Sequence, residues 1–258
     1  MSVTLTITKS RIAILTLARV EKHNAFDDVL INEMIRCIEH ASTLDVRALV
    51  LKSEGKHFSA GADLNWMKSM KDNSFEDNVA DSMELARLMQ VLYECPLPTV
   101  CLVQGAAFGG ALGLIACCDI ALADSSAKFC LSEVKLGLIP AVISPYVINA
   151  MGERNARRYF LTAEVFNAEQ AQTLGLIHEL SDDLDASAEQ LLSKLADNGP
   201  QAVKAAKRLI AEVAHQPIDD SLRQLTAERI AAIRVSDEGQ TGLTAFFEKQ
   251  APAWQQQG

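Results

Sequence analysis

The sequence predicts an α/β fold with a helical C-terminal part. In the first three quarters of the chain, short apolar runs typical of strands occur in pairs, and a segment with helical spacing of apolar residues follows them. After about Asp182 the strand-like runs stop, and only helical patterns follow. Two loops rich in glycine and alanine connect a strand to a helix. We therefore expect repeated ββα units rather than a strictly alternating doubly wound sheet.

The predicted strands are short runs rich in β-branched and apolar residues. They are residues 3–8, 11–17, 47–51, 99–103, 120–123 and 128–130. Asp27 or Asp28 can cap a helix whose apolar residues recur at helical spacing. Further helices are predicted at 63–70, at 83–93 and from about residue 111.

The C-terminal part reads as helical throughout. The predicted helices are residues 186–196, 201–214, 218–233 and 238–248, with Pro200 and Pro217 near helix starts. No low-complexity linker separates this part from the rest. We therefore expect an α/β core over residues 1–195 and a helical region over residues 196–258.

Composition limits the classes of partner. The formal net charge is −9, and no run of Lys or Arg forms a basic stripe, so a nucleic-acid partner is not expected. Hydrophobic residues make up 49% of the chain, which is enough for a sizeable core. An anionic ligand would have to be met by local positive groups.

Cysteines, histidines and apolar runs point to a cytoplasmic protein without a metal. The six cysteines form no C-x-x-C pair, and the five histidines show no metal-ligand spacing, so we expect free thiols and no metal site. The N-terminus reads as a strand rather than a signal peptide. Residues 99–118 carry almost no charge, but Gln104 and several glycines favour a buried strand, loop and helix over a membrane span.

Two loops carry the candidate chemistry. Residues 57–64 (HFSAGADL) and 104–114 (QGAAFGGALGL) each lead from a strand into a helix. Small residues let backbone N–H groups approach a ligand, and a helix N-terminus favours negative charge. One N–H from each loop could form an oxyanion hole. The alternative for either loop alone is a tight turn with close helix packing. Neither matches a phosphate-binding loop or a dinucleotide fingerprint.

A third motif, residues 118–140 (CDIALADSSAKFCLSEVKLGLIP), completes a pattern. Together with HFSAGADL and VQGAAFGGALGL, it resembles the crotonase family of enoyl-CoA hydratases and isomerases. The resemblance runs from residues 21–26 (EKHNAF) to residues 245–254 (AFFEKQAPAW).

The resemblance implies a fold, an assembly and a set of site residues. It implies a spiral of ββα units with C-terminal helices used in oligomerisation, and a homotrimer or a hexamer built from two trimers. The thioester oxygen would be held by the N–H groups of Ala62 and Gly110, and the substrate would be an acyl-CoA with no tightly bound cofactor. The implied coenzyme A contacts are Lys22, Ala25, Ala60, Asp63 and Leu64, with Phe246 and Lys249 near the nucleotide end.

The chain departs from the family pattern at the proton-transfer residues. Hydratases of this type carry two glutamates, and Glu133 matches the second while Gly113 stands where the first would be. Residues 140–145 (PAVISP) replace a glycine-rich stretch. The motifs look most like bacterial methylglutaconyl-CoA hydratase of leucine breakdown, with an isohexenyl relative of terpene breakdown next. The alternatives are an enoyl-CoA isomerase that uses a single glutamate and an acyl-CoA-binding relative without turnover.

Several side chains near these motifs have a predicted position or role. Trp66 and Met67 are candidates for the acyl pocket or for the core, and Lys135, Ser144 and Tyr146 are candidates near the acyl end. Asp119, in an apolar run, is expected to be a structural hydrogen-bond acceptor. Residues 157–159 are expected on a helix surface. We also hypothesise that a distal carboxylate of the substrate, or a water held by it, partly replaces the glutamate missing at Gly113.

Overall fold

The computed structural model describes residues 2–255 and divides the chain into two compact units. The first unit contains Met1–Cys95 and Thr99–Ala188, and the second contains Pro96–Pro98 and Glu189–Gly258. The domain boundary at residue 195 remains a prediction.

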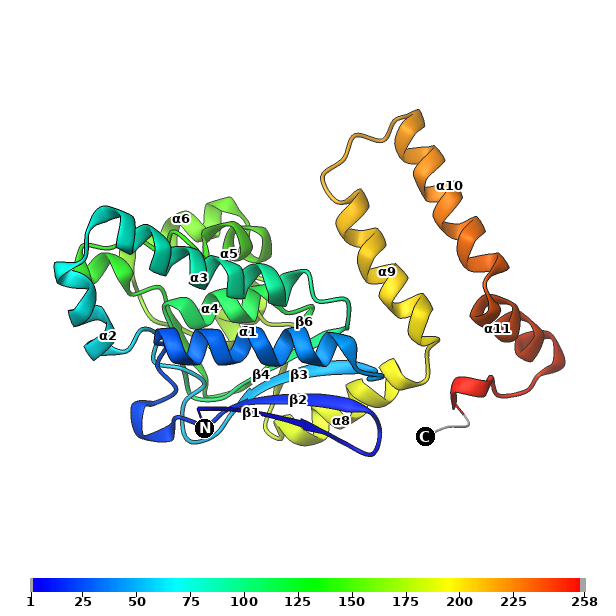
Figure 1. Ribbon diagram of the computed structural model, residues 1–258, viewed down its shortest axis with the longest axis horizontal. Helices are drawn as coiled ribbons and strands as arrows, with labels where there is room; N and C mark the ends of the chain where they lie inside the picture. The colour runs from blue at the N-terminus through cyan, green and yellow to red at the C-terminus, as the bar shows by residue number, and fades with distance from the viewer. Residues whose placement is uncertain (1, 256–258) are drawn as a thin grey trace. The chain divides into compact units, whose positions relative to one another are not determined.

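Two sheets organise the first unit (Figure 1). The larger has six strands in the order β1 (Val3–Ile7), β2 (Ile12–Leu17), β3 (Ala48–Ser53), β4 (Thr99–Val103), β6 (Ile120–Asp124) and β9 (Glu179–Ser181). Only β1 is antiparallel to its neighbour in this sheet. The smaller sheet contains β5 (Ala106–Phe108), β7 (Lys128–Cys130) and β8 (Phe166–Asn167). Consecutive strands β4 and β5, and then β6 and β7, contribute one strand to each sheet, which is the structural basis of the predicted ββα repeat.

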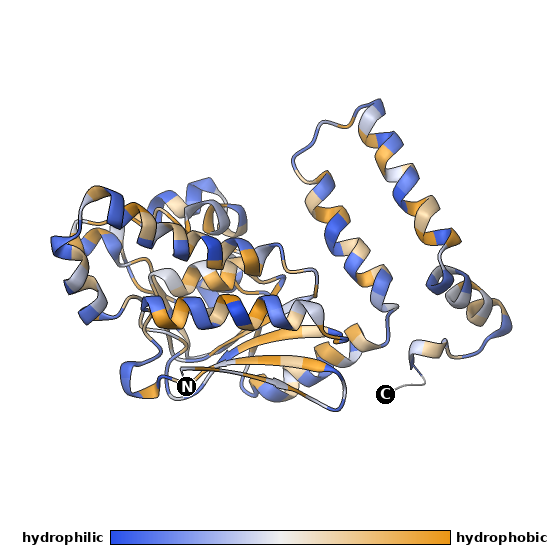
Figure 2. Cartoon of the chain, viewed as in Figure 1, coloured by the Kyte–Doolittle hydropathy of each residue, from blue (hydrophilic) through white to orange (hydrophobic). Residues whose placement is uncertain are grey.

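Helices α1 (Asp28–Thr43), α3 (Phe75–Tyr93) and α4 (Gly110–Cys117) bury their apolar faces in the core. They lie on the same side of the six-stranded sheet in Figure 1. The predicted cap of α1 is present, because the Asp27 carboxylate accepts a hydrogen bond from the Leu30 N–H at 2.9 Å. Figure 2 shows the central strands mostly in the hydrophobic colour, as expected for parallel strands that are buried on both faces.

Some helix boundaries differ from the prediction. Helix α3 begins at Phe75 rather than near residue 83, because Ser74 and Asp77 form a capping box that starts it earlier. Helices α5 (Ser144–Met151) and α7 (Ala168–Thr173) were not predicted, and α6 (Glu153–Thr162) was expected only at residues 157–159. Arg157 and Arg158 are exposed as expected, but Tyr159 is buried rather than on the helix surface, because it packs on the Phe166 ring. Helices α5 and α7 are short and bury two residues each, so they offer little apolar pattern from which to predict them. The short helix α2 (Leu64–Ser69) is capped by Asp63.

The prediction that Asp119 has a structural role is confirmed. Its Oδ2 accepts hydrogen bonds from the N–H and the hydroxyl of Thr99, at 2.7 and 2.9 Å. The Asp119 N–H in turn donates to the Thr99 hydroxyl at 2.9 Å. This exchange ties the start of β4 to the residue before β6, so Asp119 orders the sheet.

The second unit is helical. Helix α8 (Leu184–Ala196) leads into it from the first unit, and α9 (Pro200–Val213), α10 (Asp220–Val235) and α11 (Asp237–Glu248) follow. Arg229 of α10 binds Glu212 of α9 through two hydrogen bonds of 2.7 and 2.8 Å. Between residues 2 and 255, no helix combines the length and the apolar character needed to cross a membrane.

Candidate active site

The two small-residue loops are joined to each other by backbone hydrogen bonds. The Phe58 N–H donates to the Gln104 carbonyl at 2.8 Å, and the Ser59 N–H donates to the Ala106 carbonyl at 3.1 Å. The Phe108 N–H returns a bond of 3.0 Å to the Ser59 carbonyl. This is a short parallel ladder, with Ser59 opposite Ala107. The relative position of the loops is therefore set by main-chain atoms.

Two glycines allow the loops to meet. Gly61 has φ +92° and Gly109 has φ +55°, a backbone conformation that residues other than glycine rarely adopt. A Cβ on Gly61 would lie only 3.1 Å from the Phe108 carbonyl oxygen. Glycine is thus required at Gly61 both by the backbone conformation and by the approach of the opposite loop.

The N–H groups of Ala62 and Gly110 remain available where the loops meet. The backbone groups on either side of Ala62 form hydrogen bonds with Phe26. The Phe26 N–H donates to the Gly61 carbonyl, and the Asp63 N–H donates to the Phe26 carbonyl, both at 2.7 Å. Gly110 is the first residue of α4, so its N–H has no acceptor within the helix. Neither N–H donates to another residue of the described chain. Both residues line one cavity of about 240 Å³.

Glu133 lies in the same cavity, at the start of the short 3-10 helix η3 (Glu133–Leu136). A Cβ on Gly109 would lie 3.2 Å from Glu133 Oε1, so the glycine also makes room for this carboxyl group. Within the described part of the chain, the buried Oε2 has no hydrogen-bond partner. Burial raises the pKa of Glu133 above its ordinary value. A raised pKa brings a carboxyl group closer to the range in which it can both accept and donate a proton.

The space that a side chain at Gly113 would need is filled by neighbouring side chains. A Cβ there would lie 2.3 Å from Ile143 Cγ2 and 3.0 Å from Met89 Sδ. Ile143 belongs to residues 140–145, the segment that also departs from the family pattern. The two departures seen in the sequence are therefore one packing feature, in which Ile143 occupies the space beside Gly113.

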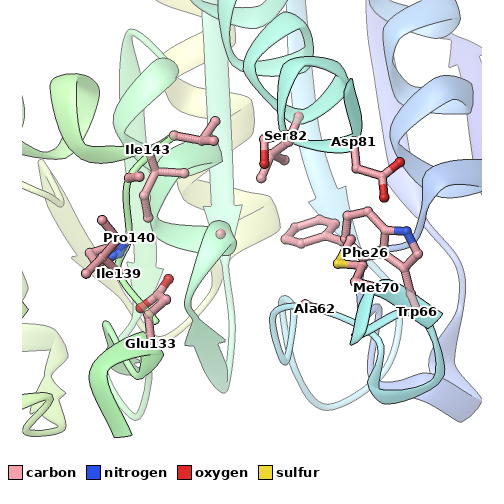
Figure 3. A pocket seen from close by; sticks show the side chains of 14 residues that line it. Phe26, Ala62, Trp66, Met70, Asp81, Ser82, Glu133, Ile139, Pro140 and Ile143 are labelled. Atoms are coloured by element: carbon pink, nitrogen blue, oxygen red, sulfur yellow. The ribbon is translucent and has the colours of Figure 1, made fainter. Parts of the chain in front are cut away.

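The rest of the cavity is formed by side chains from several elements (Figure 3). The lining residues are Phe26, Ala62, Trp66, Met70, Asp81, Ser82, Leu85, Gly110, Glu133, Ile139, Pro140, Ala141, Val142 and Ile143. Trp66 is therefore in the pocket, and the other four candidates for the acyl pocket are not among these residues: Met67, Lys135, Ser144 and Tyr146.

Sequence reasoning missed Asp81, Ser82 and Leu85, which reach the pocket from α3. Nothing in the surrounding polar stretch separates these residues from a solvated helix face. Once Leu88, Met89 and Leu92 are known to form the buried face of α3, the helical spacing indicates which of the preceding residues share that face.

Five of the predicted coenzyme A residues lie on two segments that a charged cluster connects. Lys22 Nζ is 2.7 Å from Asp63 Oδ2, and Arg19 lies 2.6 Å from Asp27 and 3.5 Å from Asp63. The Asp63 side chain is only 6% exposed. The hydrogen bond from Lys22 lowers the pKa of Asp63, although burial opposes this, and the N–H groups of α2 lower it further. Asp63 therefore acts as an anchor for Lys22 and as a helix cap.

The remaining predicted contacts differ in exposure. Ala25 is buried, whereas Ala60 is exposed and Leu64 is 73% exposed. The Ala60 N–H donates to the His23 carbonyl at 3.0 Å, which places the two segments side by side. Phe246 and Lys249 lie in the second unit, where Phe246 is 76% exposed and Lys249 follows the end of α11. Their role remains a prediction.

Among the described residues, no group of three or more His, Cys, Asp or Glu side chains is arranged to hold a metal ion. All six cysteines are free thiols, five of them buried.

Comparison with known proteins identifies relatives over nearly the whole chain. A family model described as enoyl-CoA hydratase/isomerase matches residues 7–257. A crystal structure of an enoyl-CoA hydratase from Shewanella pealeana is 55% identical, with a TM-score of 0.96, and the match covers 98% of this chain and 96% of that one. A Thermus thermophilus protein that carries the provisional name enoyl-CoA hydratase is 31% identical over 95% of this chain and 98% of its own length. The 2,3-dehydroadipyl-CoA hydratase of Escherichia coli K12 is 30% identical over 95% of each chain.

These matches confirm the predicted α/β crotonase fold with its C-terminal helices, and they confirm an enzyme of the enoyl-CoA hydratase type. They do not determine the acyl chain of the substrate. The fold, the paired loops and the matched relatives agree: this chain belongs to the enoyl-CoA hydratase/isomerase family.

Proposed function

We propose that this chain hydrates an enoyl-CoA thioester, with Ala62 and Gly110 holding the thioester oxygen and Glu133 transferring the protons. The observation that carries the proposal is the unpartnered, buried oxygen of Glu133, in the same cavity as the two available N–H groups. Coenzyme A enters as part of the substrate. Its proposed contacts are Lys22, Ala25, Ala60, Asp63 and Leu64, with Phe246 and Lys249 of a neighbouring subunit near the nucleotide.

The proposed reaction uses one carboxyl group twice. The two N–H groups stabilise the negative charge that develops on the thioester oxygen, which makes C3 electrophilic. The Glu133 carboxylate takes a proton from water as the water oxygen bonds to C3, and the electron pair of the double bond moves toward C2 and the thioester. Protonated Glu133 then gives its proton to C2. The product gains one water.

Isomerisation is the second candidate, and the packing of Ile143 favours it. With Ile143 Cγ2 2.3 Å from a Cβ at Gly113, a second acid has no room there. An isomerase needs only one carboxyl group to move a proton between C2 and C4, so the loss at Gly113 would not affect it. The product would then have the mass of the substrate. A relative that binds acyl-CoA without turnover is the remaining alternative.

The specific substrate predicted from the sequence is 3-methylglutaconyl-CoA, which hydration converts to 3-hydroxy-3-methylglutaryl-CoA. The E. coli relative supports an acyl chain of this kind, since its named substrate also ends in a carboxylate. The described pocket supports it less well, because its lining includes no Lys, Arg or His to pair the distal carboxylate. The filled position beside Gly113 also leaves little room for a water held by that carboxylate.

We further propose a cytoplasmic homotrimer or hexamer assembled through the C-terminal helices. Support comes from an apolar groove between α9 and α10, lined by Leu209, Ile230 and Ile233 among others. Light scattering of the purified protein would give the number of copies. A monomer at micromolar concentration would contradict this proposal.

The test of the reaction is product identification with a panel of enoyl-CoA thioesters, including 3-methylglutaconyl-CoA and uncharged analogues. Mass spectrometry should find a gain of one water in the native protein, and Glu133→Gln should lower kcat by about 10³-fold. Because the pKa of Glu133 is raised, the acidic limb of the pH profile of kcat/KM should lie above the ordinary glutamate range. Below that limb Glu133 is protonated and cannot accept a proton.

Glu153→Gln is the matched control, because Glu153 forms an exposed ion pair with Arg157. It should leave turnover unchanged. An unchanged product mass with a shifted double bond would favour the isomerase. Full activity in Glu133→Gln would contradict both catalytic proposals.

A further inference from the structure

The acyl pocket contains a second carboxylate that the proposed mechanism does not use. Asp81 of α3 lines the cavity and is half-buried. Figure 3 shows Asp81 and Ser82 on one side of the pocket and, on the other, Glu133 with Ile139, Pro140 and Ile143. Asp81 is therefore on the wall opposite the proton-transfer group.

Asp81 has little to neutralise its charge. Its Oδ2 accepts one hydrogen bond, from the Asn73 side-chain amide, at 3.3 Å. Within residues 2–255 it forms no ion pair. A long bond to a neutral amide orients a carboxylate but leaves its charge in place.

The rest of the lining does not offset this charge. Apart from Ser82, Asp81, Glu133 and the indole N–H of Trp66, the side chains around the cavity are apolar, and none of the lining residues is basic. Apolar walls strengthen electrostatic interactions in the pocket, because they replace water near the charge. An acyl chain that ended in a carboxylate would therefore meet a like charge without a cation to pair it.

We propose that Asp81 excludes acyl chains that end in a carboxylate, so that the pocket selects enoyl-CoA thioesters whose acyl chain is uncharged. This inference rests on the proposed function, since it assigns the cavity beside Glu133 to the acyl group. It weighs against 3-methylglutaconyl-CoA as the substrate, and it makes Asp81 a specificity residue that disfavours the wrong ligand.

Binding of two unreactive ligands tests the selection independently of catalysis. Hexanoyl-CoA and adipyl-CoA have six-carbon acyl chains that differ in the terminal carboxylate, and both lack the double bond. Calorimetry should show that the native protein binds hexanoyl-CoA about tenfold more tightly than adipyl-CoA. Raising the ionic strength should narrow this ratio, because salt screens the repulsion in a pocket open to solvent. Coenzyme A contributes equally to both ligands, so it does not affect the ratio.

Asp81→Asn should reduce the preference for hexanoyl-CoA over adipyl-CoA to about twofold, chiefly by tightening the binding of adipyl-CoA. Glu76→Gln is the matched control, because Glu76 is an exposed acid in the first turn of α3 that does not line the cavity. It removes the same charge from the same helix and should leave the tenfold preference in place. The salt dependence of the native protein provides a test that needs no variant.

Turnover of 2-hexenoyl-CoA and 2,3-dehydroadipyl-CoA separates specificity from catalysis. In Asp81→Asn the ratio of kcat/KM for the charged substrate to that for the uncharged one should rise about fivefold. Equal losses of kcat for both substrates would instead make Asp81 a proton-transfer group and overturn the inference. So would a native protein that binds adipyl-CoA as tightly as hexanoyl-CoA. If neither enoyl-CoA reacts while the binding preference holds, the proposed function fails and the selection by Asp81 stands.

Discussion

The two ends of the candidate site are built in different ways. At the thioester end, residues 57–64 and 104–110 are held together by backbone hydrogen bonds, and the groups offered to the substrate are main-chain N–H donors. At the acyl end, α3 and residues 139–143 contribute side chains. A site made of backbone groups depends on glycine at fixed positions. A wall made of side chains can be altered by single substitutions that leave the backbone in place.

This difference explains why the family can be identified from sequence more readily than the substrate. Gly61 and Gly109 have positive φ values and close neighbours, so few other residues can replace them. Asp81 and Ile143 have no such backbone requirement. Three predictions test this contrast between the two ends, beginning with the largest expected effect.

Gly109→Ala should lower kcat/KM by about 10²-fold. The new Cβ would lie 3.2 Å from Glu133 Oε1, on a residue with φ +55°, so both the carboxyl group and the adjacent Gly110 N–H should shift. Steady-state kinetics would measure the loss. Gly152→Ala is the control, because Gly152 also has a positive φ, +78°, but a Cβ there meets nothing within 4 Å. If the control lost as much activity, backbone strain alone would explain the effect.

Asp63→Asn should lower the free energy of unfolding by about 3 kcal/mol at neutral pH, since it removes the buried partner of Lys22 and leaves Arg19 with Asp27 alone. The folded-state pKa of Asp63 is lowered, so its stabilising contribution is present above the unfolded value of about 3.9 and is lost as pH falls through the folded pKa. Denaturant titrations should therefore show the difference between native and variant protein narrowing below about pH 4. Glu164→Gln, which breaks an exposed pair with Arg158, should have a much smaller effect. A difference for Asp63→Asn that does not depend on pH would argue against the charged cluster.

Gly113→Ala should lower the free energy of unfolding by about 2 kcal/mol, because the added methyl group would overlap Ile143 Cγ2. Gly113→Ala combined with Ile143→Ala should cost less than the sum of the two single changes. Thermal or denaturant unfolding of the native protein, the two single variants and the double variant would measure these costs in a double-mutant cycle. Additive costs would mean that Ile143 does not fill the space beside Gly113.

Much of the thioester end was predictable from the sequence. The strand-to-helix loops and the ββα repeat have local signals, because glycine, capping residues and apolar periodicity report on nearby backbone. Glu133 was assigned through the resemblance to the family motif, since its local sequence also fits a capping or surface carboxylate. Asp81 had no such signal, because its position in the pocket depends on how α3 packs against distant elements. The packing of Ile143 against Gly113 joins residues thirty positions apart in the chain, and only the folded structure relates them.

The strand order of the larger sheet has a consequence for folding during synthesis. Its strands lie side by side in the order in which they occur in the chain, β1-β2-β3-β4-β6-β9. Each strand that leaves the ribosome therefore finds its partner already exposed, and no later strand has to insert between two earlier ones. The candidate site needs later residues, because Gly109 donates its N–H to Cys130 of β7, three residues before Glu133. In a nascent chain the strands from β1 to β6 therefore emerge before the site is complete, and only β9 is added to the sheet afterwards.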